Sequence, residues 1–158
     1  MAIYMKYGDI KGPVTTDGFK NWIELSSVQL GAHRSIGTAA RGSTSREHSE
    51  PTISEVLVTK LTDIASPKLF LDAVAGKLDT KVEIKLTTTT KGKVETFLAF
   101  KMEHTGISSM NVSSHGDMPM ESLSLNFTKI TQTFTGMDPG ISGSPETVGY
   151  DLTLMKTI

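Results

Sequence analysis

The fold class is decided by the stretch Lys81-Val82-Glu83-Ile84-Lys85-Leu86-Thr87, in which apolar and charged side chains alternate. A period of two places Val82, Ile84 and Leu86 on one face of a β-strand and the charged residues on the other. The charged face meets water or a polar partner, so this strand has one core face. The stretch therefore predicts a half-buried strand.

The same alternation recurs elsewhere in the 158 residues. The apolar sets are Ile3/Met5/Tyr7, Leu123/Leu125/Phe127 and Val148/Tyr150/Leu152/Leu154. Two segments change phase, because Ile23 and Leu25 give way to Val28 and Leu30, and Leu123–Phe127 gives way to Ile130 and Phe134. An inserted residue restores inward pointing and bends a strand into a corner. We therefore expect β-bulges near Ser26-Ser27 and Thr128-Lys129.

One helix and several turns complete the expected elements. Ser66 can cap a helix that has Pro67 at its first position, a stripe at helical spacing, and Gly76 as a left-handed end. The stripe consists of Leu69, Phe70, Ala73 and Val74. Turns are expected at Lys91-Gly92, Thr105-Gly106, His115-Gly116-Asp117 and Asp138-Pro139-Gly140. The chain is thus predicted to be one mainly β domain over residues 1–158, with one short helix.

The segment His33–Glu50 is a long stretch of mainly small and charged residues between two strands. Loops beyond ~12–15 residues are uncommon in compact domains and are usually disordered or functional. One interpretation is disorder. The other is a projecting arm that orders against a neighbour by adding strand hydrogen bonds, with Arg34, Arg41 and Arg46 as ionic anchors.

Composition excludes several classes of function. The 16 basic and 17 acidic residues give a net charge of −1, which argues against nucleic acid as a partner. The absence of cysteine excludes disulfides, thiolate metal sites and thiol catalysis. The first twelve residues alternate and lack the apolar core of a secretory signal, and no apolar run approaches the ~20 residues of a membrane span.

The sequence lacks residue patterns typical of catalytic or metal-binding sites. Gly140-Ile141-Ser142-Gly143-Ser144 has its second glycine one place too early for a nucleophile elbow and reads as a turn. Glu47-His48-Ser49-Glu50 lacks the helical spacing of a zinc site, and His104 and His115 read as turn or surface residues, with a pairing between them left open. The sequence predicts no enzyme, no metal and no cofactor.

Several stretches, in order and spacing, resemble the haemolysin-coregulated protein (Hcp) family, the tube protein of bacterial type VI secretion. They begin with Tyr4–Gly12 and Gly18–Leu25, and continue with Ser66–Phe70, Ala75-Gly76-Lys77, Leu125–Ile130 and Val148–Leu152. Tyr150 stands where the family often has tryptophan. The resemblance implies a β-barrel-like pair of antiparallel sheets with one short flanking α-helix and a long extended loop.

The resemblance also implies a role and partners. Subunits form a homo-hexamer, the rings stack into a hollow tube, and a contractile sheath ejects the tube with a spike protein and small effector proteins in its lumen. The chain would assemble in the cytoplasm and be secreted without a signal peptide. The absence of a toxic domain after Ile158 implies the plain tube form.

By the same analogy, the long loop contacts the next ring through Arg34, Ser35, Arg41, Arg46, Glu47 and His48, and Gln29 faces the lumen. Two other classes remain as alternatives: a β-sandwich hydrolase or sugar-binding module, and a monomeric adaptor with a disordered loop. The first needs converging donor side chains that the sequence lacks. Mass in solution separates the second from a ring-forming subunit.

Overall fold

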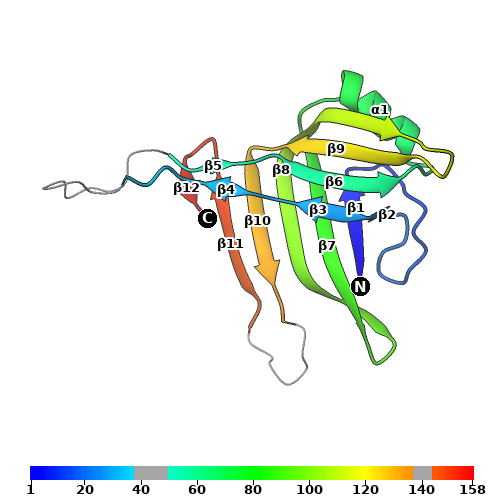
Figure 1. Ribbon diagram of the computed structural model, residues 1–158. Helices are drawn as coiled ribbons and strands as arrows, with labels where there is room; N and C mark the ends of the chain where they lie inside the picture. Colours follow the sequence, from blue (N-terminus) through cyan, green and yellow to red (C-terminus); the bar gives the residue numbers. More distant parts are fainter. Residues whose placement is uncertain (38–49, 137–143) are drawn as a thin grey trace, which may run out of the picture.

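The computed structural model describes residues 1–37, 50–136 and 144–158, and its strands form two crossing antiparallel sheets (Figure 1). The first sheet has the order β12 (Lys156–Thr157), β11 (Glu146–Asp151), β10 (Lys129–Phe134), β8 (Lys93–Ser113), β7 (Thr80–Thr90), β1 (Ala2–Tyr7), β2 (Ile23–Leu25). The second contains β3 (Ser27–Gln29), β6 (Val56–Leu61), β9 (Met120–Asn126) and the C-terminal part of β8. A two-stranded arm, β4 (Ala32–His33) with β5 (Thr52–Ile53), and one helix, α1 (Ser66–Ala75), complete the fold.

The long strand β8 joins the two sheets. Up to Thr105 it pairs with β7, and from Gly106 onward it pairs with β9. The turn expected at Thr105-Gly106 is therefore wrong. The strand instead bends there, with His104 at φ 52° and a register shift between Ile107 and Ser109. A bent strand can hydrogen-bond in both sheets, so the barrel closes along it.

The two phase changes are confirmed, but their cause is not a bulge. The chain leaves the first sheet after Leu25 and enters the second at Ser27, and it returns between Asn126 and Lys129. Each phase change is thus a corner where the chain switches sheets. The Ser26 N–H donates to the carbonyl of Thr59 at 2.7 Å, which ties the first corner to β6. Register shifts occur instead in the β7–β8 and β8–β9 pairs.

The core fills the space between the crossing sheets. Most of the apolar residues that the alternation placed on inward faces lie in it. Its fully buried side chains come from both sheets and from the helix and include Met5, Ile23, Val58, Leu69, Val82, Ile84, Leu123 and Leu125. The C-terminal set differs from expectation, because β11 ends at Asp151 and Leu154 is exposed. Asp151 accepts hydrogen bonds from the Thr153 hydroxyl and the Leu154 N–H, which lower the pKa of its carboxyl and turn the chain.

The helix has the expected position but different ends. Its N-cap is Ala65, without a side-chain cap, while Ser66 lies in the first turn and accepts from the Asp63 N–H at 2.9 Å. Gly76 is extended (φ −70°), not left-handed, and a Cβ there would lie 2.4 Å from the Asp72 carbonyl oxygen. Close backbone approach therefore accounts for this glycine. Pro67 is at the helix start, as predicted.

A charged pair is buried where α1 meets the barrel. Lys60 and Glu121 face each other across β6 and β9, with 2.8 Å between Nζ and Oε2. Lys60 also donates to the Leu61 carbonyl at 2.8 Å and to the Ser66 hydroxyl at 3.1 Å, and it lies 3.1 Å from Asp63. A buried ion pair requires such additional partners to offset its desolvation.

The turns around Lys91-Gly92 and Gly116 are confirmed by positive φ angles at these residues. The turn expected at Asp138-Pro139-Gly140 lies outside the described residues. Among the described residues, no helix combines the length and the apolar character that a membrane span requires.

Candidate functional site

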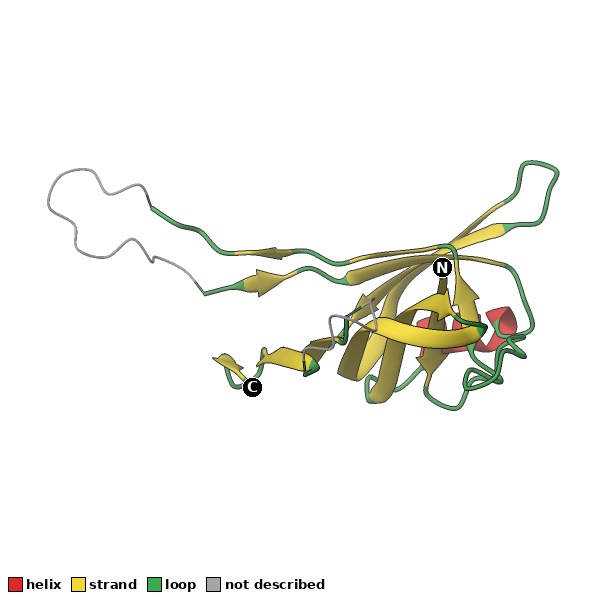
Figure 2. Cartoon of the chain, turned by 90° about the horizontal axis from the view of Figure 1, so that it is seen from below, coloured by secondary structure: helices red, strands yellow, loops and turns green. Residues whose placement is uncertain are grey.

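The arm extends from the second sheet beyond the barrel (Figures 1 and 2). Its base is held by backbone pairing of Ala32 with Ile53 and by the Ser54 N–H, which donates to the Gly31 carbonyl at 2.8 Å. Arg34 and Ser35 follow directly after β4 and are exposed. Arg41, Arg46, Glu47 and His48 lie outside the described residues. Of the predicted loop contacts, the structure therefore places two on a projecting ribbon.

The strands of the second sheet carry no charged side chain on their outer surface, and we call this surface the neutral face. At its edge, the Glu55 carboxylate, one residue before β6, accepts hydrogen bonds from Ser108 and Asn126. Gln29 lies on it, exposed, and is paired with Leu57 of β6. Hydroxyl groups cross the sheet in register, with Ser27 2.6 Å from Thr59 and Ser109 3.0 Å from Ser124. The neutral face consists of Ser27, Gln29, Leu57, Thr59, Leu61, Ser109, Asn111, Ser113, Met120, Ser122, Ser124 and Asn126. Lys60 and Glu121, the charged residues of these described strands, point inward.

The outer surface of the first sheet has the opposite character. Lys6, Glu83 and Lys101 form one cross-strand row of alternating charge. A second row runs through Glu103, Lys129 and Asp151. Opposite charges on neighbouring strands stabilise the sheet modestly and keep this surface hydrated.

Beside this charged surface, the segment between β1 and β2 folds over the sheet. Phe19 packs against Tyr4, and Trp22 meets Phe19 edge to face. The Lys85 ammonium lies 5.0 Å from the centre of the Trp22 ring. Lys85, on the charged strand that predicted the fold, thus contacts aromatic rings as well as Glu83.

An apolar groove of about 330 Å³ lies between the base of the arm and the β10–β11 part of the first sheet. We call it the arm groove. Leu30 and Ile53 line it from the arm side. Ile130, Val148 and Tyr150 line it from the sheet side, and Val148 is 56% exposed. The arm groove arises because β10 and β11 extend the sheet beyond the barrel, so their inner face has no second sheet against it.

The helix presents a second apolar surface to solvent. Of the predicted stripe, Leu69 is buried and Ala73 packs against the core, but Phe70 and Val74 are 59% and 64% exposed. The stripe at helical spacing is therefore divided between the core side and the solvent side of the helix. Leu71, 62% exposed, lies next to Phe70. We call Phe70, Leu71 and Val74 the helix face.

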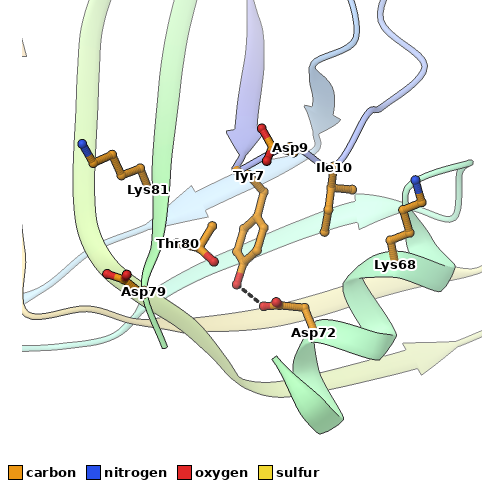
Figure 3. A pocket seen from close by; sticks show the side chains of 9 residues that line it. Tyr7, Asp9, Ile10, Lys68, Asp72, Asp79, Thr80 and Lys81 are labelled. Atoms are coloured by element: carbon orange, nitrogen blue, oxygen red, sulfur yellow. Dashed lines mark hydrogen bonds between the residues drawn. The ribbon is translucent and has the colours of Figure 1, made fainter. Parts of the chain in front are cut away.

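A polar hollow of about 470 Å³ separates α1 from the end of β1 (Figure 3). The Tyr7 hydroxyl donates to Asp72 of the helix. Lys68 and Lys81 lie on opposite sides of this pair. Burial, followed by the hydrogen bond to Asp72 and the charge of Asp72, raises the pKa of Tyr7. The phenol therefore stays protonated and fixes the helix to the sheet.

The described part of the chain does not bring its histidines together. His104 contacts Asp79 at 2.7 Å, His33 lies on the arm, and His115 lies in the turn between β8 and β9. The open pairing of His104 with His115 is therefore not formed. Within the described residues there is no group of three side chains suited to hold a metal ion. Residues 140–143 of the rejected nucleophile elbow lie outside the described part.

The geometry defines a class: a small β-barrel with one charged and one neutral wall, a projecting arm, and apolar surfaces left open for association. The model of the family described as the type VI secretion system effector Hcp matches residues 4–134. The chain belongs to this family, and is therefore a structural tube protein of type VI secretion rather than an enzyme. Family membership implies a secreted protein and an oligomeric tube assembly.

Solved structures agree with this assignment. The chain is similar to a type six secretion system protein, with 26% identity, a TM-score of 0.88 and 99% of each chain covered. It shares the fold of Hcp1 from Salmonella typhimurium, with 20% identity, a TM-score of 0.77 and 100% of each chain covered. The secreted protein Hcp3 from Pseudomonas aeruginosa is 19% identical, with a TM-score of 0.64 and coverage of 92% of this chain and 95% of that one. A search of curated protein sequences finds no match.

Sequence reasoning missed the arm groove, the helix face and the Tyr7–Asp72 bond. Tyr7 and Asp72 are 65 residues apart, so no local pattern joins them. The arm groove likewise combines strands from both ends of the chain. The neutral face did carry a readable signal, since serine, threonine or asparagine occupies the alternate positions of Leu123-Ser124-Leu125-Asn126 and its neighbours.

Proposed function

We propose that the chain, as a single domain over residues 1–158, forms homo-hexameric rings that stack into the hollow tube of a type VI secretion system. A contractile sheath drives the tube outward with a spike protein at its tip, and small effector proteins travel in the lumen. Assembly takes place in the cytoplasm, and export needs no signal peptide. Membership of the tube-protein family supports this proposal.

The observation that carries the proposal is the difference between the two barrel walls. A tube subunit needs an inner wall that holds cargo and releases it, and an outer wall that meets water and the sheath. The neutral face around Gln29 suits the inner wall, because uncharged hydroxyl and amide groups offer hydrogen bonds without strong ion pairs. The rows of alternating charge on the first sheet suit the outer wall.

The arm suits the contact between rings. Its two strands pair with each other over a short stretch and project from the barrel, so their outer backbone groups are open to a strand of another subunit. We assign this contact to the loop carrying Arg34, Ser35, Arg41, Arg46, Glu47 and His48. The guanidinium groups can form bidentate bonds with carboxylates of the next ring.

The assembly is tested by measuring the mass of the purified protein in solution and imaging it by electron microscopy. We expect the mass of six chains and rings with a central hole. A sharply monomeric protein at high concentration, with no rings in the images, contradicts the proposal and supports the monomeric adaptor.

The lumen assignment is tested by attaching a gold cluster through an engineered thiol, because the chain has no cysteine of its own. In the Gln29→Cys variant we expect the gold at the centre of each ring. The matched control is Thr147→Cys, an exposed residue on the outer side of the first sheet. Gold at the outer rim for the Gln29→Cys variant contradicts the assignment.

A further inference from the structure

Two apolar surfaces on the described part of the barrel differ in shape and position. The helix face exposes Phe70, Leu71 and Val74 at 59%, 62% and 64% of their surface. The arm groove exposes Val148 at 56% and is lined mainly by aliphatic and aromatic side chains. Exposed apolar side chains that gather in one place mark a contact with another molecule.

The two surfaces differ in shape. The helix face is convex, because it is the side of a helix turned away from the barrel and carries the ring of Phe70. The arm groove is concave, with Leu30 and Ile53 on one wall and Ile130 and Tyr150 on the other. A protruding aromatic side chain that fills an apolar groove is a typical energetic anchor of an interface.

Their positions also differ. In Figure 1, α1 lies at one end of the barrel, and the arm with β10 and β11 lies at the other. In a closed ring of identical copies every contact joins two different surfaces of the same chain, and these must face opposite neighbours. A convex and a concave apolar surface at opposite ends meet this requirement.

We propose that, in the ring, the helix face of each copy occupies the arm groove of the next copy. This inference rests on the proposed ring. Another exposed apolar pair, Leu61 and Met120, is adjacent across β6 and β9 and belongs to the flat neutral face. It is therefore assigned to the lumen wall rather than to the contact between neighbours.

Cross-linking tests the contact, again because the chain lacks cysteine. The double variant Val74→Cys/Val148→Cys, treated with a short bifunctional maleimide, is expected to give a ladder of covalent oligomers up to six chains. The matched control is Val112→Cys/Val148→Cys, since Val112 is 58% exposed but lies outside the helix face. The control should stay a single chain on a denaturing gel.

The outcomes separate the contact from the ring. Two results overturn the contact and leave the ring intact. The first is rings of normal mass in which Val74→Cys/Val148→Cys gives no ladder. The second is rings in which only Val112→Cys/Val148→Cys gives a ladder. A monomeric unsubstituted protein overturns the proposed function, and the contact with it.

A charge substitution provides a second measurement that needs no cross-link geometry. Phe70→Lys would bury an ammonium group in an apolar groove, so we expect each contact to weaken by at least about 30-fold, with smaller species in sedimentation at low concentration. Met118→Lys, at a residue 64% exposed, is the control and should leave the rings intact. Circular dichroism should show both variants folded. Rings of Phe70→Lys as stable as those of Met118→Lys overturn the proposal.

Discussion

Lys60 and Glu121 show how a single residue pair constrains this barrel. Both side chains are almost fully buried, and the lysine Nζ is surrounded by oxygen atoms of Glu121, Asp63, Ser66 and the Leu61 carbonyl. Removing one partner of a buried pair leaves a charge without compensation, which costs far more than the pair contributes. This pair therefore sets the register of β6 against β9 and the position of the helix start.

We predict that Glu121→Ala lowers the free energy of unfolding by about 3 kcal/mol, because Asp63 compensates only part of the Lys60 charge. Denaturant unfolding measures the change. Glu83→Ala breaks a partly exposed pair with Lys85 at 3.6 Å and serves as the control, with an expected loss below about 1 kcal/mol. The double variant Lys60→Met/Glu121→Leu should recover most of the stability that Glu121→Ala loses. Equal losses in Glu121→Ala and Glu83→Ala would contradict a special cost of the buried charge.

Tyr7 predicts an alkaline limit to stability. Its pKa is raised in the folded chain from the ordinary value of 10.0, so the folded state holds the phenolic proton more tightly than the unfolded state. The contribution of the protonated Tyr7 to the free energy of unfolding is complete below pH 10.0, and it falls as the pH rises above that value. Tyr7→Phe should remove this part of the decline in an unfolding series across pH 9 to 11, and an unchanged decline would exclude Tyr7 as its source.

At the scale of elements, the β7–β8 hairpin is held by its two-residue turn. Thr90 pairs with Lys93, and the two residues between them, Lys91 and Gly92, have φ angles of 50° and 78°. Turns with positive φ at both central residues match the twist of the flanking strands.

We expect Gly92→Ala to destabilise the protein by about 1 kcal/mol, because a side chain disfavours this conformation. The cause would be conformational, since a Cβ at Gly92 meets no atom within 4 Å. Lys91→Asn is the companion variant and should leave stability unchanged or slightly higher, because asparagine tolerates positive φ. Thermal unfolding compares the two, and a loss in Lys91→Asn equal to that in Gly92→Ala would argue against the backbone explanation.

For the whole molecule, the arm and the barrel are assigned to different steps of assembly. The helix face and the arm groove involve the barrel and the base of the arm, whereas Arg34 and Ser35 lie beyond that base. Ring formation and ring stacking should therefore be separable.

Deletion of Ser35–Ser45 should leave hexameric rings but impair their stacking into tubes. Mass in solution reports the rings, and electron microscopy of concentrated samples reports the tubes. The control is a chain with the same eleven residues in scrambled order, which keeps the length of the arm and loses its specific contacts. Tubes as long as those of the unchanged protein after the deletion would rule out the loop assignment.

Local patterns predicted most of the strands and the core. Alternation at Val82/Ile84/Leu86 and Leu123/Leu125 identified side chains that are buried or packed against the core, and the phase changes located both corners. The same patterns failed at Thr105-Gly106, where turn-forming residues lie in a continuous bent strand, and they did not show that Phe70 and Val74 of the apolar stripe are exposed. At Thr105-Gly106 the deciding contacts come from β7 and β9, which are distant in sequence from one another.

The sequence by itself determined which residues face inward, where the chain changes direction, and that catalytic spacing is lacking, because these depend on neighbours along the chain. Only the tertiary structure decided that β8 serves both sheets, that Lys60 meets Glu121, and that an apolar groove opens beside the arm. These features arise from pairing between residues far apart in sequence, for which neither alternation nor turn propensity carries information. The charged stretch from Lys81 to Thr87 thus predicted its strand, and the surrounding strands decided that its charges lie on the proposed outer wall.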